Sequence, residues 1–178
     1  MNKLILIGNG GHARSCIDVI ELQKKYSIIG IIDSQKLESN NDAKYPVIGN
    51  DSDLPNLLSK SKNIFIGIGF IKSSRVREEY FDRAKKLNYE FPKIISPISY
   101  VSENSRIDEG SIVMHNALIN SHCNIGANCI INSNVKISNT IIEENCEIQS
   151  GARIGEPGFG FEEKTKTKIN HHGNVIIK

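Results

Sequence analysis

Hydrophobic positions in the second half of the chain recur every six residues. Every sixth residue is β-branched and aliphatic from Val101 to Ile137: Val101, Ile107, Val113, Ile119, Ile125, Ile131 and Ile137. A small residue often follows four positions later, and the pattern slips by one residue before resuming at Ile142. Neither the 3.6-residue period of a helix nor the two-residue period of a strand explains this spacing. Three hexads per triangular coil instead predict a left-handed parallel β-helix.

Stacked coils of about 18 residues place particular hexads above one another. The hexads that begin at 107, 125 and 142 form one column, those at 113, 131 and 148 a second, and those at 119, 137 and 154 a third. Cys129 is therefore predicted directly beneath Cys146. The third column contains the slip near Ser138-Asn139-Thr140. We expect function there, because irregularities in a solenoid collect at functional sites.

The hexad pattern breaks after Gly158. Residues 158–174 predict a hairpin-like excursion, and Val175-Ile176-Ile177 reads as the first strand of a new coil. The sequence stops directly afterwards, at Lys178. An uncapped last coil leaves backbone groups and apolar surface open, so we expect a chain that is truncated at its C-terminus.

The first half predicts a β-α-β unit around a glycine-rich turn. A buried strand, Leu4 to Ile7, precedes Gly8-Asn9-Gly10-Gly11-His12-Ala13 and a helix that runs to about Lys25. A second strand, Ile28 to Ile32, ends at Asp33. Glycines at such a turn let the backbone approach a phosphate, and the helix N-terminus attracts its charge. Asp33 is placed to accept a hydrogen bond from a ribose or a base.

Further elements complete an α/β domain with a Rossmann-like fold. We expect an edge strand at 45–49, a short helix at 53–58, a strand at 64–68 and a helix from Ser73 or Ser74 to about Leu87. The predicted domains are 1–95 for the α/β unit and 96–178 for the β-helix. The first is too short for a dinucleotide fold with two halves. An NAD-type oxidoreductase is therefore a weaker alternative to a protein that binds one nucleotide-linked sugar.

Composition narrows the function further. The 178 residues carry a net charge of +2, so a nucleic-acid partner has no support. The apolar run at the N-terminus is too short for a signal peptide or a membrane span, and we expect a cytoplasmic protein. No two of the four cysteines form a C-x-x-C pair, so neither a zinc site nor another metal site is expected. His115 occupies an outward turn position and is expected in solvent.

Four motifs and the hexads together resemble one family. The motifs are Gly8 to Ala13, Gly30 to Asp33, Pro46 to Gly49 and Gly67 to Gly69, and with the repeats they resemble the sialic acid and bacillosamine O-/N-acetyltransferases. The resemblance implies a homotrimer that uses acetyl-CoA as co-substrate and acts in surface glycan synthesis. It also implies that the N-terminal domain holds a UDP-linked sugar or amino sugar.

The resemblance assigns candidate binding residues. It implies that the nucleotide sugar contacts Gly8, Gly10, Gly11, His12, Asp33, Gly67 and Gly69. Of these, Gly10, Gly11 and His12 would face the phosphates, Asp33 the uridine and Gly69 the sugar. Acetyl-CoA would lie in a groove between neighbouring β-helices and contact Gly151, Ala152, Gly158 and Phe159.

The catalytic position departs from the family. The family has a histidine followed by an acid where this chain has Asn139-Thr140, and neither residue is a general base near neutral pH. The stretch from Gly155 to Phe161 is similar to an excursion in UDP-acylglucosamine N-acyltransferases, whose catalytic histidine lies on a later coil. The remaining candidates are His122, His171 and His172, each of which also fits an exposed turn or loop. The alternative function is a catalytically incomplete protein that binds a nucleotide sugar.

Overall fold

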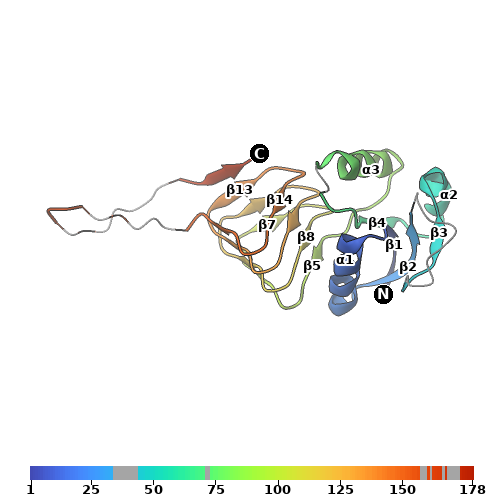
Figure 1. Cartoon of the computed structure of the whole chain (residues 1–178), viewed down its shortest axis with the longest axis horizontal. Helices are drawn as coiled ribbons and strands as arrows, with labels where there is room; N and C mark the ends of the chain where they lie inside the picture. Colours follow the sequence, from blue (N-terminus) through green and yellow to red (C-terminus); the bar gives the residue numbers. More distant parts are fainter. Residues whose placement is uncertain (34–43, 71–72, 157–159, 161, 166, 168–172) are drawn as a thin grey trace.

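A computed structural model describes residues 1–33, 44–70, 73–156, 160, 162–165, 167 and 173–178. An α/β domain lies at one end of the elongated molecule and a left-handed parallel β-helix follows it (Figure 1). Both predicted fold classes are confirmed. The predicted domain boundary at 95/96 stays a prediction, although the first β-helix strand already begins at Ile94.

The N-terminal sheet is parallel and has the strand order β3-β2-β1-β4. Its elements are β1 (Asn2–Ile7), α1 (Gly11–Gln23), β2 (Tyr26–Ile32), β3 (Val47–Gly49), η1 (Asp51–Asp53), α2 (Leu54–Leu57), β4 (Asn63–Ile66) and α3 (Arg75–Lys86). All expected elements are present. The first two strands each begin two residues earlier than expected, and β4 ends two residues earlier, which frees Gly67 to Phe70 to form a loop.

Side chains of β1 alternate between two buried faces of this sheet, as expected for a strand. Leu4 and Leu6 pack with α1 and with isoleucines of the β-helix. Ile5 and Ile7 pack on the other side with α2 and α3. Burial on both faces explains why Leu4 to Ile7 are all apolar, as in strands of covered parallel sheets.

The β-helix consists of short strands in three parallel sheets. The strands are β5 (Ile94–Ile95), β6 (Tyr100–Val101), β7 (Arg106–Ile107), β8 (Ile112–Val113), β9 (Leu118–Ile119), β10 (Asn124–Ile125), β11 (Ile130–Ile131), β12 (Lys136–Ile137), β13 (Thr140–Ile142), β14 (Glu147–Ile148), β15 (Arg153–Ile154) and β16 (Val175–Ile177). The sheets have the orders β16-β13-β10-β7, β14-β11-β8-β5 and β15-β12-β9-β6.

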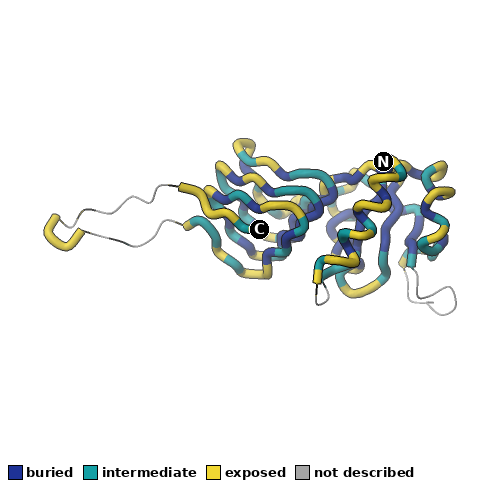
Figure 2. Tube along the Cα trace, turned by 90° about the horizontal axis from the view of Figure 1, so that it is seen from above, coloured by how far each residue is buried: buried dark blue, intermediate teal, exposed yellow. Residues whose placement is uncertain are grey.

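The predicted columns are confirmed residue by residue. Three stacks of three residues lie in register: Ile107–Ile125–Ile142, Val113–Ile131–Ile148 and Ile119–Ile137–Ile154. Because Ile130 pairs with Glu147, Cys129 lies beneath Cys146 as predicted. These aliphatic side chains and the cysteines form one buried interior, which Figure 2 shows as the dark inner path of the coils.

Corner residues of the coils adopt the left-handed conformation and stack on one another. One corner carries His122, Asn139 and Gly155, with φ values of 62°, 46° and 71°. Asparagine tolerates this conformation better than most residues with a side chain. The one-residue slip is absorbed beside this corner, since β13 still pairs with β10 in register.

One sheet of the β-helix packs against the N-terminal domain. Outward side chains of β5, β8 and β11, namely Ile94, Ile112 and Ile130, are buried in the core that includes α1. His115 adds a polar link: its Nδ1 lies 2.8 Å from Ser96 Oγ, and its Nε2 lies 2.9 Å from Asp18 Oδ2 on α1. His115 is therefore not a freely solvated residue as expected: its side chain is 24% exposed and contacts α1.

The last described strand, β16, pairs with β13, which confirms that a new coil begins at Val175. The turn at residues 162–165 lies away from the coils, at the far end of the molecule (Figure 1). Glu162 N–H donates to the Thr167 carbonyl over 3.0 Å, as in a hairpin turn. No helix in the described part of the chain is long and apolar enough to cross a membrane.

Candidate active site

A cavity of about 490 Å³ lies at the carboxyl ends of the N-terminal strands. The loop after β1, the residue after β2 and the loop after β4 all contribute to its wall. Its lining residues are Ile7, Gly8, Asn9, Gly10, Gly11, His12, Ile32, Asp33, Gly67, Ile68, Gly69, Phe70, Val76, Tyr80 and Glu147. Open α/β sheets bind ligands at this edge.

Two kinds of glycine shape the loop after β1. Gly8 has a φ of +92°, and a Cβ there would lie 2.9 Å from Ile68 Cγ1. Gly10 and Gly11 have no atom within 4 Å of a Cβ position, so they leave open space. The 13-residue helix α1 begins at Gly11, and no side chain caps its N-terminus, because the N-cap residue is Gly10. The first N–H groups of α1 therefore remain available to an anion.

His12 offers an uncharged imidazole to the cavity. Burial, and to a lesser extent the positive charge of Arg77, lower the pKa of His12 to about 4. Its Nε2 is buried and has no hydrogen-bond partner among the described residues. The ring lies against Gly69, where a Cβ would approach His12 Cβ to 3.1 Å. His12 can therefore exchange a hydrogen bond with a ligand but supplies no positive charge near pH 7.

Arg77 places a buried positive charge below the cavity. Its side chain is 1% exposed and donates to the Ile66 carbonyl, to the Ile68 carbonyl over 3.0 Å, and to the Gly110 carbonyl over 3.2 Å. A fourth, longer contact reaches the Asn128 carbonyl at 3.4 Å. Burial lowers the pKa of Arg77 to about 10, so it stays protonated near pH 7. The guanidinium thereby joins the loop after β4 to two coils of the β-helix.

Glu147 is the one lining residue that the β-helix contributes to this cavity, within the described part of the chain. It lies on β14, in the sheet that packs against the N-terminal domain. Its Oε1 accepts a hydrogen bond of 2.9 Å from Asn132 Nδ2. The side chain is partly exposed, and it brings a carboxylate to the side of the cavity that faces the β-helix.

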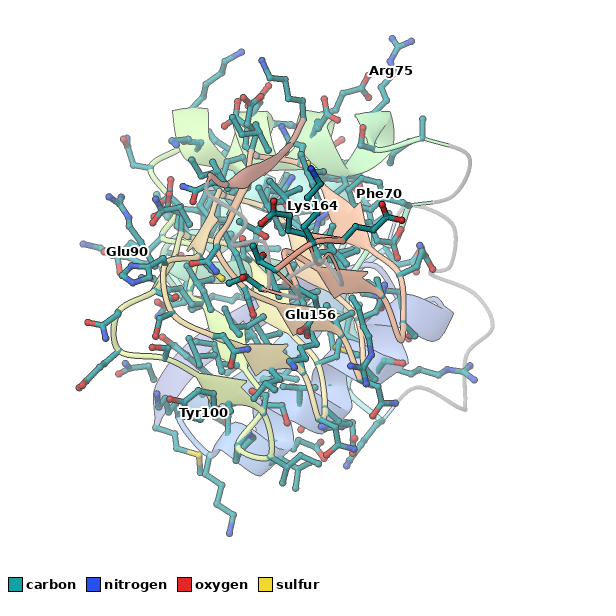
Figure 3. The ribbon with its side chains drawn as sticks, turned by 90° about the vertical axis from the view of Figure 1, so that its left-hand side faces the viewer. Phe70, Arg75, Glu90, Tyr100, Glu156 and Lys164 are labelled. Atoms are coloured by element: carbon teal, nitrogen blue, oxygen red, sulfur yellow. The ribbon has the colours of Figure 1, made fainter. Side chains whose placement is uncertain are left out.

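The corner with Asn139 lies elsewhere in the same chain. Asn139 N–H donates to the Ser121 carbonyl over 3.3 Å, so Asn139 stacks directly over exposed His122. This corner joins the sheet of β9 to the sheet of β10, whereas the N-terminal domain packs on the third sheet. In a triangular coil such a corner lies opposite the packed face. Figure 3 shows Phe70, which lines the cavity, and Tyr100 of β6 far apart across the molecule.

Two domain families match the sequence. Residues 3–84 match the PglD N-terminal domain, and residues 122–156 match the bacterial transferase hexapeptide family with six repeats. No curated protein matches the sequence significantly.

Solved structures resemble the whole arrangement. A mutant GDP-perosamine N-acetyltransferase from Caulobacter crescentus, in complex with CoA and GDP-perosamine, is 25% identical with a TM-score of 0.79 over 86% of this chain and 71% of that one. The acetyltransferase domain of PglB from Neisseria gonorrhoeae FA1090, in complex with acetyl coenzyme A, is 25% identical with a TM-score of 0.66 over 86% and 82%. The chain thus carries a PglD N-terminal domain followed by hexapeptide repeats, and it is similar in fold to these sugar acetyltransferases.

A further structure bears on the missing histidine of this sugar acetyltransferase. It is a histidine-to-asparagine mutant of the Caulobacter crescentus enzyme, 25% identical with a TM-score of 0.75 over 86% of this chain and 74% of that one. That mutant is in complex with CoA and GDP-perosamine. In that protein, therefore, replacing a histidine by asparagine leaves both ligands bound.

The structure brings most of the expected binding residues of this sugar acetyltransferase together. Every expected nucleotide-sugar residue lines the one cavity: Gly8, Gly10, Gly11, His12, Asp33, Gly67 and Gly69. Their contacts with a ligand stay predictions. Sequence reasoning missed Phe70, Val76, Tyr80 and Glu147. Phe70 follows directly on the Gly67 to Gly69 motif, whereas no motif marks the other three, which reach the cavity from α3 and from the second domain.

The expected acetyl-CoA and catalytic residues are more scattered. Gly151 and Ala152 lie at the corner between β14 and β15, where exposed Gly151 has a φ of +79°. His122 does not line the cavity. Gly158, Phe159, His171 and His172 lie outside the described residues. The roles of all these residues stay predictions. No cluster of three or more histidine, cysteine or acidic residues within the described chain could hold a metal ion.

Proposed function

We propose that this sugar acetyltransferase moves the acetyl group of acetyl-CoA to a nucleotide-linked sugar that is bound in the cavity. The observation that carries the proposal is the cavity itself. It combines open glycines and a helix N-terminus with a carboxylate of the hexapeptide domain. Solved relatives that hold CoA, acetyl-CoA and GDP-perosamine support both substrates.

The strand order suggests how the ligand lies. β2 is farther from the β-helix than β1, and β4 is nearer (Figure 1). A nucleoside contacting Asp33 after β2 would place its diphosphate over Gly10 and Gly11 at the start of α1. The sugar then extends past Gly69 toward the β-helix. Two nucleosides are candidates: uridine, which the family resemblance implies, and guanosine, which is part of the GDP-perosamine bound by the Caulobacter crescentus relative.

The chemistry is direct acyl transfer. The acceptor nitrogen or oxygen of the sugar attacks the thioester carbon, the carbon–sulfur bond breaks, and CoA leaves as its thiol after a proton is transferred. Neither a metal ion nor an acyl-enzyme is part of this proposal. We place the reaction in the cytoplasm, where acetyl-CoA and nucleotide sugars are available.

A homotrimer completes the proposed site. In one copy the corner with His122 and Asn139 lies opposite the face that packs on the N-terminal domain. A neighbouring copy would bring its own corner toward the cavity and form the acetyl-CoA groove. Two faces of the β-helix remain uncovered in one copy, and the exposed Tyr100 and Ile176 lie on them at 56% and 57% exposure. Light scattering on the purified chain tests the trimer.

Thiol release from acetyl-CoA tests the activity. The acceptors are UDP-linked and GDP-linked amino sugars, and mass spectrometry identifies the acetylated product. Turnover with either acceptor supports the proposal, whereas tight binding of NADH without acetyl transfer contradicts it. Loss of activity in His122→Gln, but not in His115→Gln, would identify His122 as the base.

A second candidate function is nucleotide-sugar binding without turnover. The observation that favours it is Asn139 at the family's catalytic corner. Calorimetric binding of a nucleotide sugar in the absence of any thiol release would support it over the transferase.

A further inference from the structure

Glu147 interrupts an apolar column at the edge of the cavity. The outward residues of the packed sheet are Ile94, Ile112, Ile130 and Glu147, which pair with one another in register. The three isoleucines are fully buried against the N-terminal domain. At the fourth level the column changes from isoleucine to an acid, and this is the level at which the cavity opens. Packing alone would favour another aliphatic residue there.

The carboxylate is oriented but not fully satisfied. Asn132 Nδ2 donates to its Oε1 over 2.9 Å and also to the Ile148 carbonyl over 3.0 Å, so the amide holds the carboxylate against the strand. Among the described residues, no hydrogen-bond donor reaches Oε2. An acceptor group held in place and facing a cavity is suited to a ligand that donates a hydrogen bond or carries a positive charge.

We propose that Glu147 binds the amine of a nucleotide-linked amino sugar and accepts the proton that this amine loses during acetyl transfer. The proposal rests on the proposed function, because it assigns a role within the same cavity. It also defines the acceptor as an amine: a carboxylate pairs with an ammonium group, whereas it is a poor base toward a sugar hydroxyl.

Two protons leave the ammonium group during the proposed reaction, one to Glu147 and one to CoA. The ammonium group of the sugar gives one proton to the Glu147 carboxylate, and the free amine attacks the thioester carbon of acetyl-CoA. The nitrogen–carbon bond forms and the carbon–sulfur bond breaks. The amide nitrogen loses its second proton to the departing thiolate, which leaves as CoA thiol. Glu147 then returns its proton to solvent.

Other titratable groups are less suited to this step. Near pH 7, His12 is held uncharged by burial and by Arg77, and its pKa of about 4 makes it a weak base. Asp33 lies after β2, at the end of the cavity that is remote from the β-helix. His122 does not line the cavity of its own chain and would reach it only from a neighbouring copy, whereas Glu147 lines the cavity directly. The buried cation Arg77 interacts electrostatically with Glu147. The competing role for Glu147 is therefore purely structural, as a negative charge that balances Arg77.

Glu147→Gln tests the proposal in the full chain, because the glutamine amide oxygen still accepts from Asn132. With an amino-sugar nucleotide at pH 7, kcat/KM should fall about 100-fold. The variant must wait for acceptor molecules that are already deprotonated. Its kcat/KM should therefore rise about tenfold per pH unit between pH 6 and 8, whereas that of the unmodified enzyme stays much flatter. Affinity for the nucleoside diphosphate alone should stay within about threefold.

The matched control is Glu103→Gln, which removes the same charge from an exposed turn of the β-helix away from the cavity and should leave kcat/KM unchanged. A parallel pH profile for Glu147→Gln and the unmodified enzyme would overturn the proposal. So would an equal loss with an amino acceptor and with its hydroxyl counterpart, as a structural countercharge predicts. If the unmodified chain turns over no acceptor, the proposed function fails. If the unmodified chain turns over an acceptor and Glu147→Gln retains full activity, only the proposed role of Glu147 fails.

Discussion

The two domains differ in how strictly the backbone conformation restricts which residue can occupy a functional position. In the N-terminal domain some of the expected binding glycines also build the loops, since Gly8 has a φ of +92° and Gly67 leaves room for Ala13. In the β-helix one corner shape accepts His122, Asn139 and Gly155 alike. A cavity residue such as Gly8 is therefore hard to replace without disturbing the fold. A catalytic residue of the β-helix can be lost while the coil stays intact, which is why fold alone leaves the base undetermined.

The largest expected effect comes from disconnecting the two domains. Arg77→Met should lower the free energy of unfolding by about 3–5 kcal/mol, because buried carbonyls of both domains lose their charged donor. Nucleotide-sugar affinity should fall as well, since the loop after β4 is no longer held. Urea denaturation and calorimetry measure the two effects. Arg75→Met on the same helix is the control and should leave stability nearly unchanged, because exposed Arg75 forms a surface ion pair with Glu79.

The next largest effect is a pH dependence of the unfolding free energy, which His12 of the N-terminal domain causes. The pKa of His12 is about 4 in the folded chain against 6.5 for the unperturbed group, so the unfolded chain binds the extra proton first. The resulting stability is present above pH 6.5 and is lost as pH falls toward 4, by up to about 3 kcal/mol. His12→Gln should remove this part of the slope. Denaturation series between pH 7 and 4.5 compare the two proteins, and identical slopes would contradict the assignment.

A smaller effect separates loop-building glycines from open ones. Gly8→Ala should cost about 1–2 kcal/mol, because the left-handed φ and the contact with Ile68 both oppose a Cβ. Gly10→Ala should cost less than about 0.5 kcal/mol, since Gly10 has a φ of −82° and open space around it. Thermal unfolding measures both. Equal costs at the two positions would contradict the distinction.

The smallest effect is expected at the β-helix corner. Asn139→His should change stability by less than about 1 kcal/mol, because His122 already adopts the same conformation one coil below. Asn134→His, at φ 60° in another corner, is the control. Thiol release with an amino acceptor should change less than about threefold, since Glu147 already accepts the proton. A gain of tenfold or more would instead show that the unmodified chain lacks a base.

Sequence patterns predicted the parts of this structure that repeat or that follow directly from a motif. The period of six gave the register of each column, and the glycine turn identified the cavity residues of the first domain. Contacts between the two domains have no comparable pattern in the sequence. Arg77 lies within the highly charged stretch of α3 and reads as a surface residue, yet it is buried. Glu147 and His115 likewise take their environment from a neighbouring domain, which no local spacing encodes.

The corner with His122, Asn139 and Gly155 also behaves as a site where chain length is free to vary. One residue is missing beside Asn139, and residues 155–174 separate β15 from β16 along the chain, yet β16 pairs with β13 in register. Strand pairing above and below fixes the coil, so the corner absorbs the difference. Doubling such an insertion costs only about 0.6 kcal/mol of loop-closure entropy. A solenoid of this kind can gain new surface at one edge without redesign of its interior.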